Sequence, residues 1–369
     1  MISARALNRA TLARQMLLER EPAPVEDAVR RLVGLQAQAP GSPYLALWNR
    51  ILNFEPAAFD EAFATGMVVK ATLMRITLHA VHRDDHPMLH NAVLRVLRAA
   101  RLGDARFIRS GVSIAEVDAF LPELLAFADR PRTVPEISQL LAERFGGDRP
   151  GLWWALRTVA PLHHVPTGGP WSFGERSFIA APAGLTLASR DESVRTLVRR
   201  YLAAFGPATI ADMSQFTLLP RTTLREAVRT LELAQPTPQM YDLPGAPLPP
   251  EDVPAPPRLL PMWDNVLLAY ADRARLIPPE YRKAVIRMNG DVLPAVLVDG
   301  YVAGVWRAVP NGIEATAFHP LPAATWDALA AEAAALSAFL ASRDPLVYAR
   351  YAHWWAKPLP AAQTRLLPS

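Results

Sequence analysis

The first two-thirds of the chain repeats one arrangement three times: a helix, a short turn and a second helix precede an extended segment of alternating polarity. In the first copy the apolar period predicts a helix over about Val25 to Gln36. A turn in "QAQAPG" follows, and a second helix opens at Ser42 with Pro43 at its first position. The alternating segment is "MVVKATLMRITLHAVHR". This order is typical of a winged helix-turn-helix unit.

Capping signals mark the other two copies. Thr133 and Glu136 have capping-box spacing, and "LWWALRTVAPL" supplies the next helix before a wing in "HHVPTGGPWSFGERSFIAAP". In the third copy "TIAD", from Thr209, and "TTLRE", with Thr223 and Glu226, are expected to cap two successive helices. The sequence therefore predicts three winged units, over residues 1–84, 85–188 and 189–246.

The remainder of the chain has a different character. Composition marks residues 247–260 as a Pro-rich linker. Beyond it, "VLLAYAD", "DVLPAVLVDG" and "YVAGVWRAV" are short alternating runs with Asp-Gly and Asn-Gly turns, as in antiparallel hairpins. A helix of about twenty residues is expected from Ala323, and "PLVYARYAHWWA" is expected to close the domain. The expected fold class is α+β, with three tandem winged helix-turn-helix units followed by a β-barrel-like domain at residues 261–369.

The residue content narrows the class of protein. A chain of 369 residues with 51% hydrophobic content can bury a large core. The longest apolar stretch near the C-terminus carries Glu332 and is shorter than a membrane span, and no signal-peptide segment opens the chain. A cytoplasmic protein is therefore expected. The absence of cysteine excludes disulfides, thiolate zinc sites and cysteine nucleophiles.

The charge leaves two interpretations open. The net charge is only +4, but most of the basic residues are arginine, whose planar guanidinium suits phosphate. This bias favours a nucleic-acid partner. A GC-rich genome would enrich arginine, alanine and proline without any functional reason.

Two neutral amides stand in "GLQAQAP", residues 34–40. Gln36 lies three residues beyond Val33 and continues the buried stripe of the predicted helix. Because Pro40 favours extended backbone before it, Gln36 and Gln38 are expected to share a face and to converge on one point. The alternative is that both amides cap the helix C-terminus or satisfy loop backbone groups.

The segment "LHAVHRDDHPMLH" invites a metal interpretation because it holds four histidines. His79 and His82 are three residues apart and His86 and His90 are four apart, but Pro87 interrupts them and no third ligand is placed. We expect a solvated wing and helix start here, with no metal. No phosphate loop or dinucleotide fingerprint occurs either, so no cofactor is expected.

Polar residues alternate with apolar ones in the first wing. Arg75, Thr77 and His79 are expected to lie on one outward face of a strand, where they would line a groove for nucleic acid. The alternative is an ordinary exposed strand face.

Several of these segments together resemble a known family. "GLQAQAP", "ATLMRITLH", "LLPMWDNVLLAYADRARLIPPEYR", "NGDVLPAVLVDG" and "GVWR" are similar to motifs of the winged-helix DNA glycosylases of the azinomycin-resistance type, which unhook interstrand crosslinks. The resemblance covers nearly the whole chain. It implies tandem winged helices around a C-terminal β-barrel, with a concave DNA-binding face. The family's signature of Gln, an apolar residue and Gln implies that Gln36 and Gln38 are catalytic, and a related branch has Asp in the second place.

The resemblance also implies a substrate and a reaction. The expected activity is that of a monofunctional DNA glycosylase, which hydrolyses the N-glycosidic bond of N7-alkylated guanine, including bulky adducts and interstrand crosslinks. Its role would be DNA repair or self-resistance to a genotoxin. The expected partner is double-stranded DNA carrying alkylated guanine, bound by a monomer at the nucleoid. The alternative function is a non-catalytic winged-helix DNA-binding protein, either a regulator or a protein that sequesters a drug.

Neutral amides suit this substrate, because N7-alkylated guanine carries a positive charge and leaves as a neutral base without a general acid. Each amide is expected to accept from the attacking water while its NH2 group is anchored elsewhere. Phosphate contacts are expected from basic residues of the wing, "ADRARL" and "EYRKAV": Arg75, Arg273, Arg275, Arg282 and Lys283. The alternative is that these residues form surface ion pairs with Asp272 and Glu280.

Overall fold

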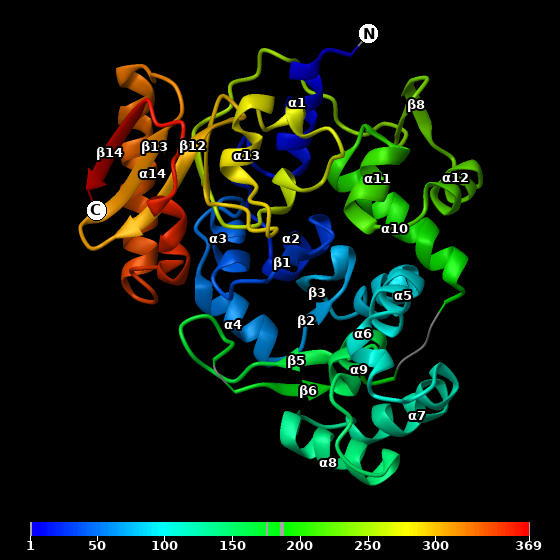
Figure 1. The fold of residues 1–369 in the computed structure, drawn as a ribbon. Helices are drawn as coiled ribbons and strands as arrows, with labels where there is room; N and C mark the ends of the chain where they lie inside the picture. The colour runs from blue at the N-terminus through cyan, green and yellow to red at the C-terminus, as the bar shows by residue number, and fades with distance from the viewer. Residues whose placement is uncertain (1, 175, 185–187, 369) are drawn as a thin grey trace.

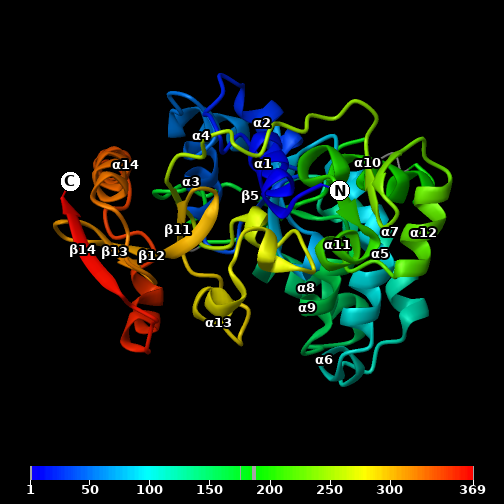
Figure 2. The ribbon, with the colours of Figure 1, turned by 90° about the horizontal axis from the view of Figure 1, so that it is seen from above.

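A computed structural model describes residues 2–174, 176–184 and 188–368 and shows an α+β protein with three antiparallel sheets. The C-terminal sheet and its long helix lie at one end of the molecule and the third repeat lies at the other (Figure 1). The view from above shows the same separation, with the N-terminal helix between the two ends (Figure 2). No helix in the described residues has the length and apolar content needed to cross a membrane.

The first repeat has six α-helices and strands and ends in a hairpin. In order they are α2 (Val25–Arg31), β1 (Leu35–Gln36), α3 (Ser42–Trp48), α4 (Pro56–Ala64), β2 (Val68–Thr72) and β3 (Leu78–His82). The short first strand pairs with the last, through Leu35 with Ala80 and Gln36 with His79. β3 also pairs with β2, so the strand order is β1-β3-β2.

The second repeat has the same strand pattern after two further helices, α5 (His86–Leu102) and α6 (Ala105–Ile108). Its elements are α7 (Ile114–Phe127), β4 (Arg132–Thr133), α8 (Val134–Phe145), α9 (Leu152–Val159), β5 (His163–Val165) and β6 (Phe178–Ala180). The capping box of Thr133 and Glu136 is confirmed at the start of α8. Lys70 of β2 pairs with His164 of β5, so the first two hairpins form one six-stranded sheet. Residue 175, within the expected wing, lies outside the described residues.

The third repeat comprises α10 (Arg190–Phe205), β7 (Ala208–Thr209), α11 (Ile210–Thr217), α12 (Arg221–Arg229), β8 (Ala234–Thr237) and β9 (Met240–Asp242). Its strand order is again first, last, middle: β7-β9-β8. The capping box at Thr209 is confirmed, with Asp212 as its acidic partner. The box expected from Thr223 and Glu226 is wrong, because α12 already begins at Arg221, after Pro220.

The C-terminal region is built on β10 (Arg258–Leu260), β11 (Ala295–Val298), β12 (Tyr301–Val309), β13 (Gly312–Ala317) and β14 (Gln363–Pro368). The last three residues of the Pro-rich segment are thus a buried strand. The Asp-Gly hairpin between β11 and β12 is confirmed, because φ is 49° at Asp299 and 81° at Gly300. Helix α14 (Ala323–Ala341) begins at Ala323, as the sequence predicts.

The described residues form no closed barrel. The five strands follow one another in open order from β10 to β14 within the described residues. The run "VLLAYAD" is not a strand, because residues Asn265–Leu267 form a short 3-10 helix, η2. The remaining elements are η3 (Arg273–Arg275), η4 (Pro279–Tyr281), α13 (Arg282–Val285) and η5 (Ala349–Ala356). Helix α14 contacts β10, β13 and β14 and covers one face of the open sheet.

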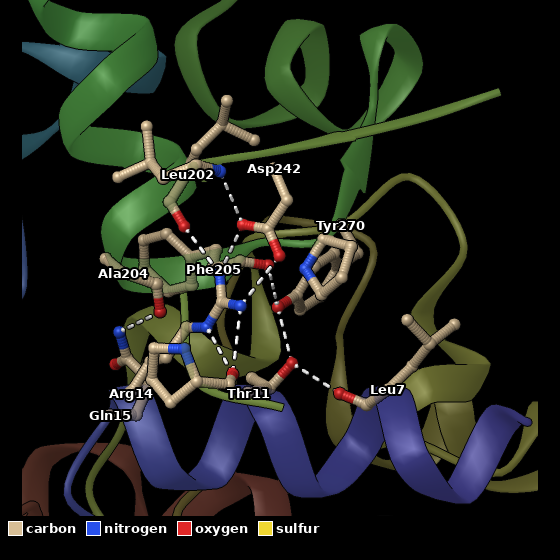
Figure 3. Close-up of polar contacts among 12 residues, drawn as sticks. Leu7, Thr11, Arg14, Gln15, Leu202, Ala204, Phe205, Asp242 and Tyr270 are labelled. Atoms are coloured by element: carbon tan, nitrogen blue, oxygen red, sulfur yellow. Dashed lines mark hydrogen bonds and ion pairs between the residues drawn. The ribbon is translucent and has the colours of Figure 1, made fainter. Parts of the chain in front are cut away.

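The N-terminal helix α1 (Ala4–Arg14) joins the third repeat to the C-terminal region through buried polar groups (Figure 3). Arg14 forms two hydrogen bonds, of 2.7 and 2.8 Å, to the carboxylate of Asp242 at the end of β9. Thr11 Oγ1 lies 2.7 Å from the hydroxyl of Tyr270, which donates to the carbonyl of Phe205. A side chain at Gly300 would meet Asn8 of this helix at 2.5 Å, so the β11–β12 turn requires glycine.

A second buried ion pair fixes the first repeat to the segment after β10. Arg50, just beyond α3, donates to both oxygens of Asp264 at 2.8 Å. Both side chains are only 1% exposed. Apolar contacts reinforce this junction, since one buried cluster contains Trp48 of the first repeat with Trp306 of β12 and Leu336 of α14. Residues just after Asp264 are thereby held against the first repeat.

Candidate active site

Gln36 lies on a strand and not at the end of a helix. Helix α2 ends at Arg31, because Val33 and Gly34 have φ of 65° and 122°, outside the helical region. A side chain at Gly34 would meet Val81 of β3 at 2.6 Å, so this glycine permits β1 to approach β3. Gln36 is 5% exposed and pairs with His79. The expected helix from Val25 to Gln36 is therefore too long.

The wing does not continue as a strand through Arg75. Residues Met74–Ile76 form a 3-10 turn, η1, with φ of 54° at Arg75 and 59° at Ile76. The expected alternation of outward polar residues fails for this reason. His79 is fully buried, and Thr77 is half-buried with its hydroxyl donating to the carbonyl of Met74 at 3.2 Å. Neither residue offers an open face for DNA.

Arg75 connects three distant segments at one point. Its Nη2 donates to Gln36 Oε1 at 2.8 Å and to Asn265 Oδ1 at 3.0 Å. The guanidinium lies 4.9 Å from the ring centroid of Phe216 in α11. Asn265 in turn donates to the carbonyl of Gly34 at 2.6 Å. The first repeat, the third repeat and the C-terminal region therefore meet beside Gln36.

His79 is neutral in this network. Its Nδ1 lies 2.9 Å from the carbonyl of Thr77, which only accepts, so Nδ1 carries the proton. Nε2 is then free to accept from Arg75 Nη2 at 3.3 Å. Burial, and next the charge of Arg75, lowers the pKa of His79 to about 3. Burial, with a smaller contribution from Arg273, lowers the pKa of Arg75 to about 9, so Arg75 remains charged at neutral pH.

Gln38 is exposed, two residues beyond Gln36. Its Oε1 lies 3.5 Å from the backbone nitrogen of Leu78, at the start of β3. This is a long hydrogen bond. Gln36 and Gln38 lie on one extended segment, one buried and held, the other open to solvent.

Left-handed backbone clusters around this site. Arg75 and Ile76 of η1 have positive φ. Three more non-glycine residues with positive φ lie within three positions along the sequence of Gln36, Phe216 or Asn265: Val33, Leu218 and Trp263. Such conformations cost about 1–3 kcal/mol each and persist where surrounding contacts fix them. Their concentration here supports a functional assignment of the site.

The histidine-rich segment is not solvated, contrary to the expectation. His82 of β3 is buried, and so are His86 and His90 of α5, which packs on α9 and α10. Burial lowers the pKa of His90 to about 4 and that of His163 in β5 also to about 4, so both are neutral. No group of three or more potential metal ligands occurs in the described part of the chain.

The other four expected phosphate contacts lie in η3 and α13 of the C-terminal region: Arg273, Arg275, Arg282 and Lys283. Arg282 and Lys283 are exposed and line a cavity of about 450 Å³ together with Arg273. Arg273 donates to the carbonyl of Leu267 at 2.6 Å and Arg275 to that of Pro207 at 2.9 Å. In the described residues these two arginines therefore bind backbone carbonyls and not the carboxylates of Asp272 or Glu280. Burial, followed by Arg282, lowers the pKa of Arg273 to about 10.

Sequence patterns missed two members of the site. Asn265 directly precedes "VLLAYAD", which was expected to be a strand, and Phe216 is one apolar residue among many in α11. Nothing local to either residue indicates contact with Arg75. Only the fold brings them to Gln36.

Residues 29–339 match the model of a family described as DNA glycosylase AlkZ-like. Since this match spans most of the chain, the protein belongs to the AlkZ-like DNA glycosylase family and is an enzyme of that class. A Streptomyces sahachiroi protein named interstrand DNA cross-link repair glycosylase is 26% identical over 342 residues, which cover 83% of this chain and 88% of that protein.

A solved structure confirms the fold. The Streptomyces sahachiroi DNA glycosylase AlkZ has a TM-score of 0.76 to this chain, with 24% identity, over 91% of this chain and 96% of that one. The two proteins therefore share their overall fold.

Proposed function

We propose that this DNA glycosylase hydrolyses the N-glycosidic bond of N7-alkylated guanine in double-stranded DNA, including bulky adducts and interstrand crosslinks. Its relative named as a cross-link repair glycosylase supports this choice of substrate. The enzyme would act as a monofunctional glycosylase and as a monomer at the nucleoid. Its role would be DNA repair or resistance to a genotoxin.

The observation that carries the proposal is that, within the part of the chain that the structure describes, no carboxylate bonds to Gln36, Gln38 or Arg75. In the described residues Gln36 binds the cation Arg75, and the other side-chain partners of Arg75 are neutral: they are Asn265, His79 and the Phe216 ring. Asp264 is the nearest carboxylate in sequence to Asn265, and Arg50 holds both of its oxygens. Glycoside hydrolysis commonly relies on two carboxylates. A site without one suits a base that is already cationic and leaves unaided.

The two amides have different roles in this proposal. Arginine only donates hydrogen bonds, so the Gln36 atom facing Arg75 is the oxygen, and its Nε2 is the free end. We expected from the sequence that the NH2 group of each amide would be anchored, whereas in Gln36 the oxygen is anchored. Gln38 is exposed and its oxygen is only weakly engaged, so it is the better acceptor for a water molecule. We assign the water to Gln38 and a donor role toward the substrate to Gln36.

A crosslinked base cannot rotate into a deep pocket, since both strands hold it. An open site is needed, and Gln38 lies at the surface. The three repeats, each with a short strand and a hairpin after a helix pair, would be winged helix-turn-helix units that hold the duplex across this surface.

The test is a base-release assay on three duplexes, with N7-methylguanine, a bulky N7 adduct or an N7 crosslink at one position. Mass spectrometry would detect the free modified base, and alkali would cleave the abasic site that remains. A reaction without protein corrects for spontaneous depurination. We expect release from all three duplexes. Tight binding of the damaged duplexes without release would instead support a non-catalytic DNA-binding protein.

Phosphate contacts are tested separately by the salt dependence of binding. Arg282→Gln and Lys283→Gln should each lower the slope of log K against log salt by about one unit on duplex DNA. Arg365→Gln, on the edge strand β14, is the control and should leave the slope unchanged. An unchanged slope for Arg282→Gln would remove Arg282 from the DNA interface.

A further inference from the structure

Arg75 is held in a conformation that its own backbone does not favour. Both Arg75 and the following Ile76 have positive φ, which costs about 1–3 kcal/mol at each non-glycine residue. Backbone hydrogen bonds close the turn, and the side chain adds to them, because Nη2 alone has three acceptors within 3.3 Å: Gln36, Asn265 and His79. Arg75 therefore points into the protein and not toward a phosphate.

The partners of Arg75 are unusual for a largely enclosed cation. Each of them is neutral, and among the ion pairs of the described residues Arg75 forms none. The four most deeply buried arginines of the described residues each face a carboxylate: Arg9, Arg14, Arg50 and Arg258. A purely structural cation would be more stable with such a partner. The charge of Arg75 thus acts on neutral dipoles, and the amide of Gln36 is the nearest of them at 2.8 Å.

This contact determines how Gln36 meets a ligand. A hydrogen bond from a charged donor is stronger than one from a neutral donor, and it polarises the amide that accepts it. With Oε1 held by Arg75, the Nε2 group is directed away from the guanidinium and becomes a better donor. Within the described residues the side-chain hydrogen bond of Gln36 is made by its oxygen, and its Nε2 donates to no other group.

We propose that Arg75 is a positioning residue, which orients and polarises the Gln36 amide so that Nε2 donates to an acceptor atom of the departing base. The proposal rests on the proposed function. When the bond between C1′ and N9 breaks, its electron pair passes to the base, which changes from cation to neutral and becomes a stronger acceptor. The oxygen of water forms the new bond to C1′ and the water proton passes to solvent. A donor toward the base thus binds the transition state better than the ground state.

The test is a double-mutant cycle between Arg75→Met and Gln36→Ala, with single-turnover base release from an N7-methylguanine duplex. Arg75→Met should lower the maximal rate by about 10- to 100-fold in the wild-type background and by less than about 3-fold in the Gln36→Ala background. The enzyme concentration for half-maximal rate and the salt slope of DNA binding should not change. Arg132→Met is the control, because Arg132 also stacks on a phenylalanine, Phe127, at 4.0 Å, but lies in the second repeat.

Three results would overturn the proposal. Equal loss of rate in both backgrounds would show that Arg75 does not act through Gln36. A salt slope lowered by about one unit, with an unchanged maximal rate, would make Arg75 a phosphate contact. Full activity of a folded Arg75→Met would show that the contact is dispensable. If the Met variant does not fold, Arg75→Lys takes its place in the cycle, because it keeps the charge but cannot reach all three acceptors. A wild-type enzyme that releases no base would refute the proposed function itself.

Discussion

Replacement of Gln36 by alanine is expected to slow the maximal single-turnover release of N7-methylguanine by about 10- to 1000-fold, or about 1.4 to 4 kcal/mol of transition-state stabilisation. Gln38→Ala should slow it within the same range, because the water then has no fixed acceptor. DNA affinity should remain within a few-fold of the wild type. Since both amides serve one reaction, the double variant should lose less than the sum of the two single losses.

Matched variants make this result interpretable. Gln139→Ala, at an exposed glutamine of α8 that bonds only Glu143, should leave the rate unchanged. Gln38→Asp should retain part of the activity, because a carboxylate can also accept from water. If both alanine variants release base at the wild-type rate in folded protein, the amides only satisfy backbone groups and the assignment of the site is wrong.

Asp264→Asn is expected to lower the free energy of unfolding by about 3–5 kcal/mol, because it leaves Arg50 charged, buried and without its counter-ion. One carboxylate oxygen of Asp264 also accepts from the backbone nitrogen of Val266 and so caps η2. An asparagine side chain can retain that bond. The measured effect would therefore come from the lost charge. The measurement is the shift of urea unfolding, with base release measured on the folded protein because Asn265 is adjacent.

The control for this pair is Asp118→Asn. Asp118 also binds an arginine, Arg98, through two hydrogen bonds of 2.7 and 3.0 Å, but its side chain is 51% exposed. Exposed pairs contribute about 0–1 kcal/mol. A double variant, Arg50→Met with Asp264→Leu, should recover part of the lost stability, since no charge is left buried. Equal small effects for Asp264→Asn and Asp118→Asn would show that the buried pair does not hold this junction.

Local signals predicted the elements whose geometry is local. The capping boxes at Thr133 and Thr209 and the Asp299-Gly300 turn depend on residues only a few positions apart, and all are present. Helix α14 starts at Ala323 for the same reason, after Pro322 at its N-cap. Periodicity over such short distances needs no knowledge of the tertiary fold.

Elements that depend on distant partners were not predicted. β1 contains only two residues, and it forms because Gln36 pairs with His79, which is far along the chain. The spacing of apolar residues alone therefore predicted a helix at this position. Polar residues of α1 such as Arg14 are buried against Asp242, which no amphipathic pattern shows. The open sheet likewise follows from α14 covering its face and from η2 replacing an expected strand.

The candidate site shows the same division. The motif "GLQAQAP" identified Gln36 and Gln38 from the sequence, but their convergence on one point was an inference from spacing. The structure holds Gln36 by Arg75 and leaves Gln38 exposed. The alternation of polar and apolar residues led us to expect Arg75 at a DNA-facing surface. That pattern cannot show that two residues of positive φ, Arg75 and Ile76, turn the chain inward at η1.

The central claim is that neutral amides suffice because the leaving base is already cationic. Its most direct test compares single-turnover release of N7-methylguanine and of uncharged 8-oxoguanine from the same position of one duplex, at saturating enzyme. Release of N7-methylguanine should be at least about 100-fold faster, because the neutral base needs a general acid that the site does not supply. Release of the two bases at similar rates would contradict the claim and would require a proton donor elsewhere in the site.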